Sequence, residues 1–287
     1  MVSEARQVPL AAGLYFVATP IGNARDITLR ALDILRSADV LVAEDTRTLR
    51  RLMEIHGVPL DGRRVLAYHD HNGAAMRPRL LDAVRTGKSV AYASDAGTPL
   101  VADPGYSLGR AMTGEGLVIT SAPGPSAVLA ALTLSGLPSD CFIFAGFSPT
   151  AKSARKSFLE SFRDVAGTLV LFESPRRLSA MLAAAVEVLG PERDAAVCRE
   201  LTKRFEEVRR GTLADLVEQY HGIVPKGEIV LCIAKGATEV DPARVRDAMT
   251  EAMKTQKLKA AATDVADRFG VSKRDLYQLG LEIQSED

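Results

Sequence analysis

Tryptophan is absent from this chain of 287 residues, and aromatic side chains make up only 5% of it. A broad platform of rings on which successive nucleic-acid bases stack is therefore not expected. An excess of positive charge is also missing, because 36 lysines and arginines balance 36 acidic residues. This balance excludes a globally basic surface, so any contact with nucleic acid must come from local basic patches.

Cysteine and long apolar runs are scarce too. The three cysteines, Cys141, Cys198 and Cys232, lie far apart in apolar runs and form no CxxC motif. That spacing argues against a disulfide framework or a zinc site and favours buried, reduced thiols. No apolar run reaches the roughly 18 residues of a membrane span, and residues 1–13 lack the apolar core of a signal peptide. We therefore expect a cytoplasmic protein.

Short β-rich runs alternate with helical patterns in the first part of the chain. The pattern predicts strands at 14–19, 39–45, 64–69, 89–94 and 116–122. The helices predicted between them are 27–38, 46–57, 74–87 and 106–114. Such alternation with short connections predicts a parallel sheet with helices on both faces, and ligands bind such sheets at the C-terminal ends of the strands.

A second α/β unit is predicted from PGPSA (123–127) onward, with strands at 141–147, 168–174, 194–201, 206–212 and 226–234. Its pattern is more mixed, so antiparallel pairs are expected. The chain is long and apolar enough for two domains and an extension. The boundaries we expect are 1–121, 122–236 and 237–287.

The extension has a helix-turn-helix-like pattern. A proline-capped helix start is predicted near 242, and two further helices are predicted on either side of Gly270, the second capped by Ser272. Its basic residues predict contact with RNA phosphates, whereas a small helical hairpin packed on the body is the alternative interpretation.

The loops after the first two predicted strands carry different chemistry. TPIGN contains only Gly22, so it matches neither GxGxxG nor GxxxxGK[ST], and a dinucleotide or triphosphate cradle is poorly supported. AEDTR places Glu44 and Asp45 at a strand end, where successive side chains point to opposite faces. Asp45 is suited to cap the next helix. The arginines that follow form either a solvated basic face or a substrate rim that attracts phosphates.

The loop YHDHN places His69 and His71 on one face of an extended segment. Two imidazoles can supply two ligands of a metal site, but no third ligand can be placed from the sequence. A general base or a hydroxyl-positioning role is favoured, because histidine titrates near neutral pH. A hydrogen-bonded helix cap is the structural alternative.

In the loop SDAGTPLVADPG (94–105), the prolines stiffen the chain and the glycines allow the backbone to approach a ligand closely. Asp95 can accept hydrogen bonds from hydroxyl or amino groups, and carboxylates are poor neighbours for a phosphate, so a cationic or hydroxyl-bearing ligand is favoured over a bare phosphate. A rigid turn with an aspartate cap is the structural alternative. Asp103 is predicted to be a structural cap. In FESPRR, Arg176 and Arg177 at a helix start oppose the helix dipole, which indicates either phosphate contact or a salt bridge.

Taken together and in this order, these stretches resemble the tetrapyrrole-methylase superfamily and, within it, the ribosomal RNA small-subunit methyltransferase I family. The matching stretches span about 14–234: ATPIGNARDITLRA, DVLVAEDTR, YHDHN, SDAGTPLVADPG, SAPGPSAVLAAL, LFESPRRL, CRELTKRFEEVRRGTL and KGEIVLCI. The resemblance implies two α/β domains of the tetrapyrrole-methylase type with S-adenosylmethionine in the cleft between them, plus a small C-terminal helical extension.

The resemblance also implies an activity. This is 2′-O-methylation of a cytidine ribose in the decoding region of 16S rRNA, on the naked RNA or the 30S subunit, by a homodimer that requires no metal. The cofactor-binding residues it implies are Pro20, Ser94, Asp95, Ala96, Gly97, Thr98, Pro99, Ala122, Pro123, Gly124, Ser126, Phe172, Glu173, Ser174, Leu201, Gly227 and Glu228.

Methyl transfer to a hydroxyl depends on alignment and benefits from a base. The catalytic candidates on the loops that face the cleft are Glu44, Asp45, His69 and His71. The candidates for RNA phosphate contact are Arg47, Arg50, Arg176, Arg177, Lys257, Lys259, Lys273 and Arg274. Two alternatives remain open: a small-molecule, tetrapyrrole-type methyltransferase, and a non-catalytic RNA-binding factor in ribosome assembly. A nucleotide-phosphate hydrolase is disfavoured by the missing phosphate loop.

Overall fold

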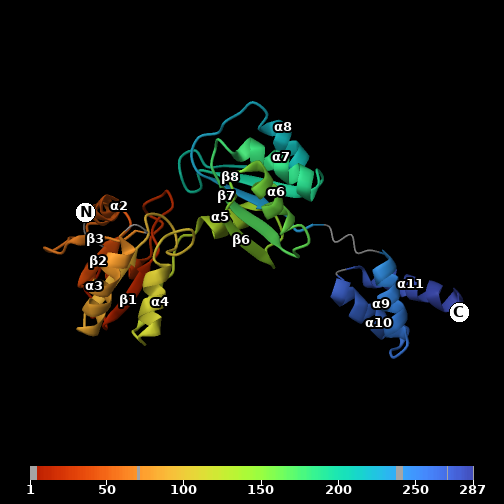
Figure 1. The fold of residues 1–287 in the computed structure, drawn as a ribbon, viewed down its shortest axis with the longest axis horizontal. Coiled ribbons are helices and arrows are strands. Elements are labelled where there is room, and N and C mark those ends of the chain that lie inside the picture. Colours follow the sequence, from red (N-terminus) through yellow and green to blue (C-terminus); the bar gives the residue numbers. More distant parts are fainter. Residues whose placement is uncertain (1–4, 70–71, 237–241, 270, 287) are drawn as a thin grey trace.

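The computed structural model describes residues 5–69, 72–236, 242–269 and 271–286. These residues form two five-stranded sheets, each covered by helices, and a group of three C-terminal helices (Figure 1). The predicted architecture of two α/β units and a helical extension is confirmed. None of the helices in these ranges has the length and apolar composition of a membrane span.

The first sheet is entirely parallel, as predicted, with the strand order β3-β2-β4-β1-β5. Its strands are β1 (Gly13–Val17), β2 (Val40–Ala43), β3 (Val65–Ala67), β4 (Ser89–Ala93) and β5 (Ile119–Ala122). The helices that connect them are α1 (Leu29–Ser37), α2 (Thr46–Ile55), α3 (Gly73–Arg85) and α4 (Tyr106–Gly114).

Alternating residues of each strand divide the core of this unit into two layers. In β1, Tyr15 and Val17 pack with α1 and α2 on one face, whereas Leu14 and Phe16 pack with α3 and α4 on the other. The neighbouring strands β1 and β4 therefore send their chains to opposite faces of the sheet. Ligand sites in such sheets lie at the C-terminal ends of strands that diverge in this way. The loops after β1 and β4 are TPIGN and SDAGTP.

The second sheet has the order β6-β7-β10-β8-β9, in which only β6 and β7 are parallel. Its strands are β6 (Phe142–Phe147), β7 (Thr168–Glu173), β8 (Asp194–Arg199), β9 (Glu207–Thr212) and β10 (Ile229–Ile233). The expected antiparallel pairs are confirmed. One face is covered by α6 (Lys152–Glu160), α7 (Leu178–Leu189) and α8 (Leu213–Gln219).

Helix α5 (Ala127–Ser135) follows β5 in the chain but packs on β8 and β10 of the second sheet. Ile21 and Val101, from loops of the first unit, pack against the same apolar cluster. The two units therefore meet at the C-terminal edge of the first sheet. Cys198 and Cys232 are buried as predicted, but Cys141 is exposed because it precedes the edge strand β6.

The C-terminal group consists of α9 (Pro242–Met253), α10 (Leu258–Phe269) and α11 (Lys273–Glu286). The predicted helix start at Pro242 is confirmed. Among the described residues, the apolar cluster at the centre of this group, which includes Met249, Val265 and Leu276, is formed by these three helices, with Val271 of the turn between α10 and α11 packed against it. It is therefore a three-helix unit with a core of its own.

Candidate active site

A cavity of about 490 Å³ lies between the two units, within the size range typical of small-molecule sites. Most of its lining comes from the loop after β4, the start of α5, and the strand ends and loops of the second sheet, and Ile21 is added from the loop after β1. The predicted cofactor residues that line it are Asp95, Ala96, Gly97, Thr98, Ser126, Phe172, Glu173, Ser174, Gly227 and Glu228. Sequence positions far apart in the chain are thus brought to one cleft.

The other predicted cofactor residues do not line this cavity. Pro20 lines a neighbouring one, and the remaining residues are Ser94, Pro99, Ala122, Pro123, Gly124 and Leu201. Ser94 is buried, and its hydroxyl donates to Gly97 O at 2.6 Å. Ala122 is fully buried in the first core. Ser94 therefore holds the loop after β4 in place, and the buried Ser94 and Ala122 side chains do not face the cavity.

Hydrogen bonds fix the loop after β4 to its surroundings. Thr19 and Gly97 pair through both backbone groups, at 3.0 and 2.9 Å, which joins the loops after β1 and β4. Thr98 Oγ1 donates to Pro125 O at 3.0 Å and ties the same loop to the start of α5. The first wall of the cavity is therefore rigid.

The backbone around the cleft is strained. Leu100 (φ 72°) and Ala102 (φ 63°) on the first unit, and Glu200 (φ 51°) and Thr202 (φ 63°) on the second, occupy the left-handed region although they carry side chains. Such residues each cost on the order of 1–3 kcal/mol and cluster at functional sites. Both loops that flank the cavity are thus held in conformations that surrounding contacts must maintain.

Asp103 is a residue of this cavity that sequence reasoning assigned to a structural cap. Helix α4 instead has Gly105 as its N-cap, and Asp103 lines the cavity. Its Oδ2 atom is buried and has no hydrogen-bond partner among the described residues. Burial, with smaller contributions from the charges of Glu44 and Asp95, raises the pKa of Asp103 to about 7. The local sequence offered no signal for this, because the strained loop turns Asp103 back toward β2 and β4.

Asp45 caps α2 as predicted and is bound to Arg47. Arg47 N donates to its Oδ1 at 2.8 Å, and Arg47 Nη2 lies 2.6 Å from Oδ2. Hydrogen bonds from the Arg47 side chain and backbone lower the pKa of Asp45 to about 2. Such a carboxylate is a weak proton acceptor at neutral pH. The backbone N–H of Asp45 donates to Asp95 Oδ1 at 2.9 Å, which orients Asp95.

Two of the other catalytic candidates, Glu44 and His69, lie at the same edge of the sheet. Glu44 is half-buried, and its charge acts on Asp103 and Tyr92, away from Asp45. This agrees with the expectation that Glu44 and Asp45 face opposite ways. His69 is half-buried, and its backbone N–H donates to Asn72 Oδ1 at 2.9 Å. His71 lies outside the described residues.

The predicted RNA contacts fall into two environments. Arg177 is turned inward, where its Nε lies 2.9 Å from Glu173 Oε1, so the salt bridge that the sequence left open is present. The exposed candidates are Arg47, Arg50, Arg176, Lys257, Lys259, Lys273 and Arg274. In the part of the chain that the structure describes, no three His, Cys, Asp or Glu residues are grouped so that they could hold a metal ion.

The family model of the Tetrapyrrole (Corrin/Porphyrin) Methylases matches residues 13–217, which is more than half of the chain. The chain therefore belongs to this class of methylases. The model of the RsmI C-terminal HTH domain matches residues 239–284, which include all of the three-helix unit except residues 285–286.

Relatives with higher sequence identity show to which family within this class the chain belongs. The chain is 48% identical over 278 residues to Ribosomal RNA small subunit methyltransferase I of Mesorhizobium japonicum, covering 96% of this chain and 94% of that protein. The identity is 40% to the protein of the same name in Vibrio cholerae, covering 94% of each chain. Within the methylases, the chain thus belongs to the ribosomal RNA small subunit methyltransferase I family, as its motifs predicted.

Solved structures of more distant proteins share the fold. Uroporphyrin-III-C-methyltransferase from Thermus thermophilus superposes with a TM-score of 0.55 at 22% identity, over 78% of this chain and 94% of that one. The methyltransferase CobJ superposes with a TM-score of 0.60 at 18% identity, over 79% of this chain and 95% of that one. At these identities the likeness concerns the fold alone.

Proposed function

We propose that this protein transfers a methyl group from S-adenosylmethionine to the 2′-hydroxyl of a cytidine in the decoding region of 16S rRNA. The observation that carries the proposal is the cavity between the units, where the loop after β4, Phe172 and the Gly227–Glu228 segment converge. Its relatives at 38–48% identity carry the name Ribosomal RNA small subunit methyltransferase I. The substrate is the naked RNA or the 30S subunit, and the enzyme acts as a homodimer in the cytoplasm.

The residues of the cavity fit S-adenosylmethionine chemically. Apolar side chains on the second unit, Phe147 and Phe172, suit the adenine ring, and Val101 adds apolar surface from the first. Carboxylates at Asp95, Asp103 and Glu228 suit hydroxyl and amino groups and favour a positively charged sulfonium. A phosphate-bearing ligand would meet repulsion at the same place.

The cofactor and this chain supply different parts of the reaction. S-adenosylmethionine supplies the methyl carbon, which bonds to the ribose oxygen as the carbon–sulfur bond breaks, its electron pair staying on sulfur. We assign the hydroxyl proton to the Asp103 carboxylate, whose Oδ2 has no partner in the described structure. Burial, with smaller contributions from the charges of Glu44 and Asp95, keeps that carboxyl basic. Asp45 positions Asp95 through its backbone, and His69 and His71 stand as further candidates on the adjoining loop.

Gly227 provides a test of the cofactor site. Its φ is +94°, and an added Cβ would overlap the Glu200 carboxyl group. We expect Gly227→Ala to weaken S-adenosylmethionine binding about tenfold, since strain of about 1–3 kcal/mol must be relieved by movement of the cavity wall. Isothermal titration calorimetry measures this. Gly62→Ala is the matched control, because Gly62 also has a positive φ (+77°) but has open space around its Cβ. Equal affinities for the two variants would contradict the assignment.

We propose domain boundaries at 121/122 and 236/237, and truncation tests the second boundary and the role of the basic tail. A protein that ends at residue 236 is expected to bind S-adenosylmethionine normally, because α9–α11 form a core of their own. Its affinity for 16S rRNA should fall at least tenfold, and the salt dependence of binding should become shallower. Filter binding at several salt concentrations measures both. Unchanged RNA affinity would remove the tail from the proposal.

A panel of acceptors separates the proposed function from its alternatives. Purified protein is incubated with methyl-labelled S-adenosylmethionine and with 30S subunits, naked 16S rRNA or a uroporphyrinogen-type tetrapyrrole. The proposal predicts label in the RNA samples alone. Label in the tetrapyrrole would favour a small-molecule methyltransferase, and RNA binding without any transfer would favour an assembly factor.

A further inference from the structure

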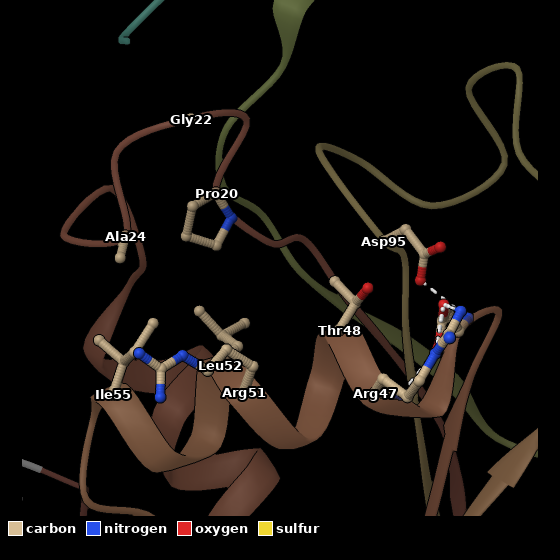
Figure 2. A pocket seen from close by; sticks show the side chains of 10 residues that line it. Pro20, Gly22, Ala24, Arg47, Thr48, Arg51, Leu52, Ile55 and Asp95 are labelled. Atoms are coloured by element: carbon tan, nitrogen blue, oxygen red, sulfur yellow. Dashed lines mark hydrogen bonds and ion pairs between the residues drawn. The ribbon is translucent and has the colours of Figure 1, made fainter. Parts of the chain in front are cut away.

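A second cavity of about 530 Å³ lies beside the first, between the loop after β1 and helix α2 (Figure 2). The loop contributes Pro20, Gly22 and Ala24, and α2 contributes one of its faces. The residues on that face are Arg47, Thr48, Arg51, Leu52 and Ile55. Asp45 and Asp95 complete the lining.

Asp95 lines both cavities. Its Oδ1 accepts the hydrogen bond from Asp45 N at 2.9 Å, so the carboxylate is held at the boundary between them. A group bound in the second cavity can therefore reach a group bound in the first at this residue. The second cavity is open to the outside next to the site that we assign to the cofactor.

The walls of the second cavity are held by contacts at both ends of the loop. His56 Nε2, at the end of α2, lies 2.7 Å from Ala24 O. Asn23 N donates to Thr202 Oγ1 of the second unit at 3.1 Å. A Cβ on Gly22 would come within 2.9 Å of Leu201 O, so the loop lies directly on the second unit. The space is thus largely preformed.

The lining is apolar at one end and cationic along α2. Ile55 is 38% exposed, although it is a large apolar side chain. In Figure 2 it lies beside Arg51, with Pro20 and Leu52 nearer the middle and Arg47 toward Asp95. An apolar surface with a guanidinium beside it is the kind of surface on which an unstacked RNA base is held.

The cations of this cavity are accessible to a ligand. The side chain of Arg47 is 87% exposed and that of Arg51 is 69% exposed. Their partners are Asp45 and Glu54, at 2.6 and 2.8 Å. Exposed ion pairs of this kind are weak in water, so a phosphate can compete for the guanidinium groups.

We propose that the second cavity receives the acceptor nucleotide of the RNA, turned out of its strand. The base lies against Leu52 and Ile55 with Arg51 at its edge or face, Arg47 holds a neighbouring phosphate, and the ribose reaches Asp95. This assignment rests on the proposed RNA methylation and adds where the substrate nucleotide binds. A free phosphate would leave the apolar end unused, and an apolar ligand would leave the two arginines unused.

The test compares variants within the cavity with matched changes elsewhere. Ile55→Glu places a carboxylate against the base and is expected to lower kcat/KM for 30S subunits at least 30-fold. Ile55→Ala should lower it about three- to tenfold. The affinity for S-adenosylmethionine should change less than twofold in both. Val118→Glu is the control, because Val118 is 56% exposed and lies at the opposite edge of the sheet, before β5.

Arg51 is tested in the same assay. Arg51→Gln is expected to lower kcat/KM for 30S subunits about tenfold, whereas Arg110→Gln, on the exposed face of α4, should have no effect. Thermal unfolding of every variant identifies any that fail to fold. Photo-crosslinking of wild-type protein to 16S rRNA substituted with 5-iodocytidine gives a second readout, with crosslinks expected in the peptide that contains 46–55.

The outcomes distinguish this inference from the function on which it rests. If wild-type protein methylates no RNA, the proposed function fails. If wild-type protein methylates RNA but Ile55→Glu and Arg51→Gln behave like their controls, with no crosslinks in 46–55, the nucleotide binds elsewhere and only the assignment of this cavity is overturned.

Discussion

Replacing Asp103 with asparagine is expected to lower kcat for RNA methylation by about 100-fold and, at the same time, to stabilise the protein at alkaline pH. The rate falls because asparagine cannot take up the hydroxyl proton, and a positioned base typically contributes 10²–10⁴-fold. In the wild type, kcat should rise with pH until Asp103 is ionised, at a pH of about 7. In the variant this inflection should disappear.

The stability effect follows from the same carboxyl group. Its pKa is about 7 in the folded protein against an ordinary value of 3.8, so between these pH values the folded state binds more protons than the unfolded state. The free energy of unfolding therefore falls as pH rises from about 4 to 7. At this half-buried position the loss is about 2 kcal/mol after screening by solvent. Asp103→Asn removes it.

Urea unfolding at pH 4 and pH 8 measures this effect. The variant should match the wild type at pH 4 and exceed it by about 2 kcal/mol at pH 8. Asp82→Asn, on the exposed face of α3, is the control and should change neither stability nor rate. If the Asp103→Asn protein is destabilised at both pH values and keeps the inflection of kcat with pH, the role of Asp103 is structural and not catalytic.

Glu173→Ala is expected to lower the free energy of unfolding by about 3–5 kcal/mol, because it removes one partner of a buried ion pair. The Glu173 carboxylate has no exposed surface and is bound by Arg177 at 2.9 Å, Ser148 Oγ at 2.5 Å and Ser174 N at 2.7 Å. Without it, the Arg177 guanidinium and the Ser148 hydroxyl lose their common acceptor. The loss is therefore larger than that of a single hydrogen bond.

Glu187→Ala is the matched control for this prediction. Glu187 also pairs with a cation, Lys156, but more than half of its side chain is exposed. Its loss should lower the free energy of unfolding far less than the loss of Glu173, because solvent screens an exposed ion pair. Guanidinium unfolding of the three proteins at pH 7 gives the comparison. Similar costs for the two variants would show that burial does not govern the Glu173 pair.

The sequence predicted those elements whose patterns are local. The five strands of the first unit and the helices between them follow from apolar runs of strand length and from amphipathic spacing. The order β3-β2-β4-β1-β5 does not follow, because strand neighbours are chosen by packing across the sheet. Yet this order places β2 beside β4, and so Asp45 beside Asp95.

In the candidate site, too, the sequence predicted the features that depend on neighbouring residues and not those that depend on distant contacts. Asp45 was recognisable as a helix cap because capping depends on the next few residues. Asp103 was not recognisable as a residue of the cleft, since its position depends on Leu100 and Ala102 turning the loop. The sequence did not decide whether Arg177 contacts a phosphate or a carboxylate. Ser148, which binds Glu173 together with Arg177, comes from a distant segment.

The most direct test of the account is the identity of the methylated nucleoside. Wild-type protein and methyl-labelled S-adenosylmethionine are incubated with 30S subunits, and the recovered 16S rRNA is digested to nucleosides and separated by liquid chromatography with mass spectrometry. The account predicts that the label appears in 2′-O-methylcytidine and falls about 100-fold with Asp103→Asn. Label in a base-methylated nucleoside, or no label in RNA that the protein binds, would contradict it.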